Sequence, residues 1–108
     1  MVITKKQKIS TPKSMIKPYK ETYYTQEGTD RPYIVREFSP DVEDDELVWH
    51  RDENFRNITV LSGSGWKLQM DDELPTELVV GKQYYIAGQT YHRVIKGEGN
   101  LVVRIENI

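Results

Sequence analysis

The chain has 108 residues, with 15 lysines and arginines against 17 aspartates and glutamates, which gives a formal net charge of -2. This length fits one small domain with one modest core, and the near-neutral charge argues against a dedicated nucleic-acid binder. The chain has no cysteine, which excludes disulfides and cysteine-ligated zinc or iron–sulfur sites, so any metal needs nitrogen and oxygen ligands.

Residues 1–18 are expected to form a basic, flexible N-terminal arm ahead of a single β-barrel domain over residues 19–108. The arm carries five lysines, two prolines and few large apolar residues. No stretch of the chain approaches the ~18 apolar residues of a membrane span, and the N-terminus lacks the apolar block of a secretory signal. We therefore expect a cytoplasmic protein with no membrane contact.

Short strands are expected in the first part of this domain. The aromatic cluster in Tyr19–Thr29 is expected to form a short strand or to dock on a face of the barrel, followed by a turn at residues 27–30. Tyr33–Phe38 is β-branched and aromatic, and it is followed by Ser39-Pro40 and an acidic loop over residues 41–46. This loop separates two predicted strands.

The segment Leu47–Asp52 predicts a strand with chemistry on one face. Side chains alternate along a strand, so His50 and Asp52 point the same way. The second and last histidine of the chain, His92, lies on a later strand that could run alongside. Two imidazoles and one carboxylate on one side of a metal suit non-haem Fe(II). The sequence also allows a metal-free pocket in which Arg56 neutralises Asp52.

The remaining residues predict a series of short strands and no helix. Asn57–Ser62 and Trp66–Met70 are expected to form a hairpin around Gly63-Ser64-Gly65. Strands at this spacing, separated by Gly, Pro, Asn or Asp, indicate an all-β fold, an antiparallel sandwich or barrel. The further predicted strands are residues 78–81, 83–86, 91–95 and 101–105.

The spacing of these residues resembles the first of the two short motifs of the cupin superfamily. That motif has His, one residue, His, three or four residues, Glu, six residues and Gly. Here His50, Asp52, Arg56 and Gly63 stand at those positions. The spacing is kept, while two residue types change.

The second cupin motif has Gly, five residues, Pro, one residue, Gly, two residues, His, three residues and Asn. Gly81 and His92 match it, whereas Ala87, Gln89 and Lys96 do not. The resemblance implies a small antiparallel double-stranded β-helix of the jelly-roll kind. It also implies a ligand set of three histidines and one glutamate, of which this chain keeps His50 and His92 and offers Asp52 for the middle histidine.

Three functions are compatible with these residues. The first is a mononuclear Fe(II) oxygenase that acts on a small anionic molecule, with zinc, manganese or nickel as alternative metals. Arg56 would orient the anion, and Gln69 would act as a further ligand or hydrogen-bond a substrate. The His-x-Asp…His arrangement is also similar to the signature of 2-oxoglutarate oxygenases, although its gap of 42 residues is short for that family. The other two functions are a non-enzymatic module that binds a sugar or an organic acid, and a sugar isomerase or epimerase with His50 or His92 as base.

Two further expectations concern surfaces. The large aromatic residues would either line a ligand pocket or, by default, lie in the core or at a dimer interface. We expect a homodimer, because barrels of this kind commonly pair through their sheets. The aromatic residues concerned are Trp49, Trp66, Tyr84, Tyr85 and Tyr91.

Overall fold

The computed structural model describes residues 19–29, 31–41 and 49–108, and within these ranges all regular structure is β. The predicted arm over residues 1–18 and most of the predicted acidic loop lie outside the described residues. Among the described residues, no helix is long and apolar enough to cross a membrane. The strands are β1 (Tyr19–Thr25), β2 (Pro32–Phe38), β3 (Arg56–Ser64), β4 (Lys67–Met70), β5 (Thr76–Glu77), β6 (Gln83–Ile86), β7 (His92–Ile95) and β8 (Glu98–Asn107).

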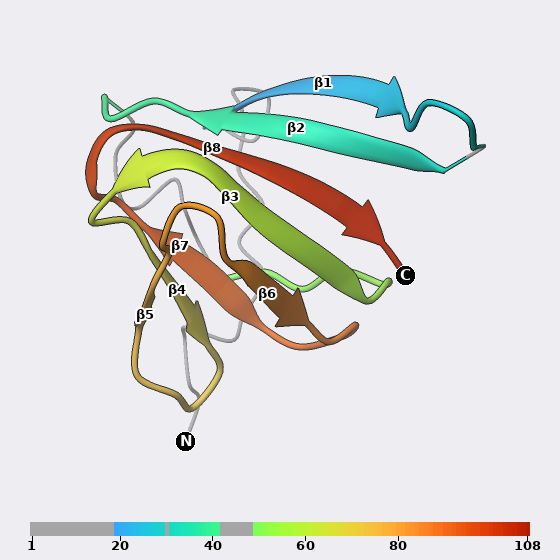
Figure 1. The fold of residues 1–108 in the computed structure, drawn as a ribbon. Coiled ribbons are helices and arrows are strands. Elements are labelled where there is room, and N and C mark those ends of the chain that lie inside the picture. Colours follow the sequence, from blue (N-terminus) through green and yellow to red (C-terminus); the bar gives the residue numbers. More distant parts are fainter. Residues whose placement is uncertain (1–18, 30, 42–48) are drawn as a thin grey trace, which may run out of the picture.

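The strands form two antiparallel sheets. The larger sheet has the order β1-β2-β8-β3-β6, and the smaller has the order β5-β4-β7. Figure 1 shows the long strands β2, β8 and β3 lying side by side, with β4, β5 and β7 below them. This arrangement confirms the predicted all-β fold and its small antiparallel barrel of two sheets.

The core lies between the two sheets, as the alternation of buried and partly buried side chains along β8 shows. Leu101, Val103 and Ile105 are buried, whereas the residues between them are only partly so. Trp66 enters this core with no exposed surface, and its indole Nε1 donates a hydrogen bond of 3.0 Å to the Gly99 carbonyl. One face of the larger sheet therefore supplies most of the apolar interior.

The predicted hairpin of residues 57–62 with residues 66–70 is wrong. β3 continues to Ser64 and pairs with β6 and β8, while β4 pairs with β5 and β7 in the other sheet. The register of β3 shifts between Val60 and Ser62 and again before Ser64. Gly65 then adopts a positive φ of 74°, which glycine tolerates without steric cost. The glycines thus carry the chain from one sheet to the other.

Two other predicted strands differ from the structure. In the segment Leu47–Asp52, residues 47 and 48 lie outside the described part, and His50 forms only a single β-bridge. Residues 78–81 form no strand, because a turn ends at Gly81, whose φ is 87°, and β5 is confined to Thr76–Glu77. The other predicted strands agree with the structure to within a few residues at their ends.

Candidate metal centre

A single β-bridge places the two histidines opposite each other. The His50 N–H donates to the His92 carbonyl at 3.0 Å, and the His92 N–H donates to the His50 carbonyl at 2.9 Å. Directly opposed residues of an antiparallel pair project their side chains to the same side. The imidazole centroids are accordingly 4.4 Å apart, with an interplanar angle of 63°.

Asp52 joins this pair from two residues further along the chain. Its carbonyl accepts a 2.7 Å hydrogen bond from the Gln89 N–H, which fixes the backbone against the turn before β7. Gly88 permits this approach, because a Cβ there would lie 2.6 Å from the Glu53 carbonyl oxygen. One nitrogen from each histidine and one carboxylate oxygen of Asp52 then lie within 4.8 Å of one another.

The hydrogen bonds of His92 determine which ring nitrogen faces the site. Nδ1 lies 2.8 Å from the carbonyl oxygen of Thr90, and because a carbonyl only accepts, Nδ1 carries the hydrogen. In the neutral ring Nε2 then has a lone pair, and this atom is 3.4 Å from Oδ2 of Asp52. Two lone pairs face each other there, so the contact is attractive only when a proton or a metal cation lies between them. Histidine ligands of metals commonly donate their other ring N–H to a backbone carbonyl in this way.

Asp52 is ionised and loosely held. Its Oδ2 is 3.3 Å from Nη1 of Arg56, and this buried oxygen has no hydrogen bond of good geometry within the described residues. The pKa of Asp52 is lowered from 3.8 to about 2, first by the hydrogen bond from His92 when its ring carries a proton on both nitrogens and then by the charge of Arg56, while burial opposes the shift. A buried carboxylate oxygen of this kind, beside two imidazoles, fits a divalent cation.

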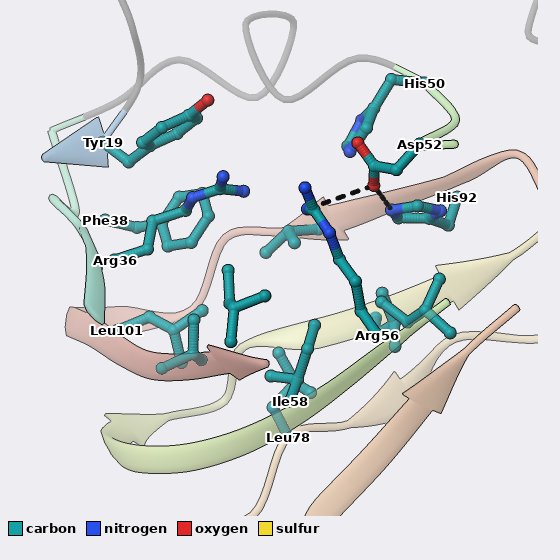
Figure 2. Close-up of a pocket in the computed structure, with 15 residues that line it drawn as sticks. Tyr19, Arg36, Phe38, His50, Asp52, Arg56, Ile58, Leu78, His92 and Leu101 are labelled. Atoms are coloured by element: carbon teal, nitrogen blue, oxygen red, sulfur yellow. Dashed lines mark ion pairs between the residues drawn. The ribbon is translucent and has the colours of Figure 1, made fainter. Parts of the chain in front are cut away.

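The three residues open into a cavity of about 210 Å³ between the sheets. Figure 2 shows His50, Asp52 and His92 at one end, with the Arg56 side chain rising from β3 so that its guanidinium points at Asp52. The rest of the wall is mainly aliphatic. Its apolar members include Phe38, Ile58, Leu68, Leu78, Ile86, Val94, Leu101, Val103 and Ile105.

The structure brings four of the five predicted site residues together, namely His50, Asp52, His92 and Arg56. It does not bring Gln69 to the cavity. Gln69 pairs with Arg93 across β4 and β7, and its amide oxygen accepts a 3.0 Å hydrogen bond from Arg93 Nε. Because His92 and Val94 face the cavity, the alternation of β7 turns Arg93, and Gln69 with it, to the opposite face.

The large aromatic residues named from the sequence do not line the cavity. Trp49 and Trp66 are buried, and Tyr85 is exposed. The sequence analysis missed Arg36, which lines the cavity from β2. Alternation could have indicated it, since Arg36 lies two residues before the buried Phe38 on the same strand.

Comparisons with known proteins identify the fold but no close relative. No protein-family model matches the chain, and no curated protein sequence matches it either. Among solved structures, the Neisseria meningitidis protein NMB1881 is 14% identical, with a TM-score of 0.63, over 88% of this chain and 90% of that one. A cupin domain from Bordetella pertussis is 19% identical, with a TM-score of 0.54, over 82% of this chain and 93% of that one.

A third similar structure is that of HppE with cobalt(II), in complex with Tris buffer. It is 18% identical, with a TM-score of 0.63, over 83% of this chain. The present chain spans about half of its length, since the match covers 53% of the HppE chain. These likenesses, together with the two antiparallel sheets, show that the chain has the cupin fold.

Proposed function

We propose that His50, Asp52 and His92 hold one divalent metal ion and that the protein acts as a metal-dependent enzyme on a small anionic molecule. The observation that carries this proposal is the contact between Nε2 of His92 and Oδ2 of Asp52, 3.4 Å apart, with the hydrogen of His92 committed to Thr90 on the other side of the ring. A cation between these atoms makes the arrangement favourable without any added proton.

Iron(II) is the metal that this donor set suits best, because two imidazoles and a carboxylate on one side leave other positions open. When bound, the iron would supply dioxygen activation, which makes an oxygenase the most specific form of the proposal. Zinc, manganese and nickel accept the same donors. The HppE structure with cobalt(II) supports the proposal, as it places a divalent metal in a protein of similar fold.

The other residues of the site would bind and orient the substrate. Arg56 carries a positive charge into the cavity next to the three proposed ligands, and a guanidinium binds carboxylate or phosphate through parallel hydrogen bonds. The rest of the wall is mainly aliphatic, so the interactions of these charges are stronger than at an open surface. Arg56 is therefore the proposed anchor for the anionic group of the substrate.

A non-enzymatic, metal-free binding module is the second candidate, and the ion pair of Asp52 with Arg56 favours it. In that case Arg56 would neutralise the carboxylate and the cavity would hold a ligand without a metal. A sugar isomerase or epimerase receives less support, because the wall is aliphatic and offers few groups to hydrogen-bond hydroxyls. The homodimer and the cytoplasmic location stay predictions.

Metal analysis of protein purified without a histidine tag tests the proposal. We expect about one equivalent of divalent metal per chain after loading with Fe(II) under argon, and loss of this metal in Asp52→Asn and His50→Ala. Glu53→Gln is the matched control, because it removes the adjacent carboxylate from an exposed position outside the cavity. Substoichiometric metal in both the wild type and His50→Ala would favour the binding module.

Oxygen consumption tests the most specific form of the proposal, which is an oxygenase. If the protein is an oxygenase, uptake of dioxygen will depend on Fe(II) and on an organic co-substrate. Metal binding with no oxygen uptake across a panel of small acids would leave the metal site standing and argue against the oxygenase.

A further inference from the structure

Two arginines line the cavity, and they differ in how their charges are partnered. Arg36 donates from Nε at 2.8 Å and from Nη2 to the same carboxylate oxygen of Glu21, and its guanidinium lies over the Tyr19 ring at 4.1 Å. Arg56 has instead a single ion pair, at 3.3 Å, and its buried Nε has no hydrogen-bond partner within the described residues. A buried donor without a partner is costly, so Arg56 is the group that gains most from an anionic ligand.

The charge of Arg36 is neutralised by Glu21 on the neighbouring strand. Glu21 and Arg36 are directly opposed on β1 and β2, and their side chains are only 9% and 14% exposed. Figure 2 shows the Arg36 side chain next to Tyr19 and Phe38, on the other side of the cavity from His50 and His92. Arg36 therefore forms a neutral, packed wall, and the cavity has one charged end and one apolar end.

The apolar end sets the size and polarity of the ligand. Most of the wall consists of aliphatic side chains from both sheets, among them Ile58, Leu78 and Leu101. A cavity of about 150 Å³ lined in this way holds a benzene molecule, and this one measures about 210 Å³. Hydroxyl groups placed against such a wall would lose their hydrogen bonds to water without replacement.

We infer that the ligand of this site is a small amphipathic acid of about six to eight carbons in all, with its carboxylate at Arg56 and the proposed metal ligands and its hydrocarbon body on the aliphatic wall. This inference deepens the proposed function and rests on it for the metal next to the carboxylate. It separates the site from one built for sugars or sugar acids.

A homologous series of carboxylates tests the inference. Binding of acetate, butyrate, hexanoate, decanoate and gluconate to the zinc-loaded protein would be measured by calorimetry. Each buried methylene is worth about fourfold in affinity, so we expect a rise from acetate through butyrate to hexanoate and a fall at decanoate, which exceeds the cavity. Hexanoate and gluconate have the same carbon chain and carboxylate, and gluconate is expected to bind at least tenfold more weakly.

Two variants locate the binding site. Arg56→Gln is expected to weaken hexanoate binding about tenfold or more, since a hydrogen bond to a charged group is lost. Arg31→Gln, which removes the same charge from an exposed position outside the cavity, is expected to leave the affinity unchanged. Equal weakening by both substitutions would overturn the role given to Arg56.

The outcomes separate this inference from the proposed function. If one zinc binds per chain but the affinity does not rise from acetate to hexanoate, or gluconate binds as tightly as hexanoate, the inference is wrong and the metal site stands. If zinc does not bind while hexanoate still binds in an Arg56-dependent way, the proposed metal site is wrong and the assignment of an amphipathic acid stands.

Discussion

Replacing Asp52 with asparagine measures what the charge of this carboxylate contributes to the stability of the metal-free protein. In the metal-free folded state the pKa of Asp52 falls from 3.8 to about 2, first through the hydrogen bond from the protonated His92 ring and next through the charge of Arg56. One pKa unit corresponds to about 1.4 kcal/mol, so the ionised group stabilises the fold by about 2 kcal/mol. Because the folded pKa is the lower one, this contribution is present above pH 4 and is lost as the pH falls through the folded value.

Urea unfolding in the presence of a chelator, at pH 5, 3 and 2, gives the required free energies of unfolding. Relative to Asp52→Asn, the wild type is expected to lose about 1 kcal/mol between pH 5 and pH 3 and about 2 kcal/mol by pH 2. Glu53→Gln, at the exposed residue next to Asp52, is the control, because it retains the Asp52 carboxylate and hence its contribution to stability. If the difference in stability between wild type and Asp52→Asn is the same at pH 5 and pH 2, the carboxylate is not held by the charges around it, and the electrostatic description of the site fails.

Three other measurements test the fold and the site. Gly97→Ala is expected to lower the free energy of unfolding by about 3 kcal/mol, because its Cβ would lie 2.3 Å from a backbone nitrogen. Gly28→Ala, at φ 78° in open space, should cost only about 1 kcal/mol. Similar costs of the two substitutions in urea unfolding would contradict the close approach at Gly97. Glu21→Gln leaves the charge of Arg36 buried and unpaired, and it should lower the free energy of unfolding by about 3 kcal/mol. Glu106→Gln, in a more exposed ion pair, should lower it by less than about 1 kcal/mol. Thermal unfolding would distinguish the two variants. Zinc at a hundred times its dissociation constant is expected to stabilise the protein by about 2.7 kcal/mol, and a chelator should reverse this rise in Tm; an unchanged Tm would argue against a site specific to the folded state.

The candidate metal site could be predicted from the sequence because its geometry depends on short-range rules. His50 and Asp52 share a face because they are two residues apart in extended chain. His92 was the only other imidazole in the chain, so only one pairing of histidines was available. Although the predicted strand over residues 47–52 reduces to one bridge in its described part, that bridge is at His50 itself, and it suffices to orient both rings.

The pairing of strands was harder to predict, since it depends on which chain segments approach through space. The glycines between Ser62 and Trp66 resemble a hairpin turn in sequence, and a tight turn and a change of sheet both require a positive φ. What decides between them is the long strand β8, which pairs with both β2 and β3 and so occupies the edge that β4 would have needed. This competition involves residues about 40 positions away and leaves no local signal.

The polarity of the cavity depends on an interaction that no single strand encodes. A strand pattern indicates that Arg36 shares a face with Phe38, but it does not indicate whether the arginine carries a net charge into the cavity. The register of β1 on β2 decides this, because it sets Glu21 directly opposite Arg36 and cancels the charge there. Arg56 starts β3, and β6 and β8 oppose it with Ile86 and Asn107, which carry no charge. Its ion-pair partner is Asp52, which belongs to the proposed metal site. The unequal partners of two similar arginines therefore give the cavity one charged end and one apolar end.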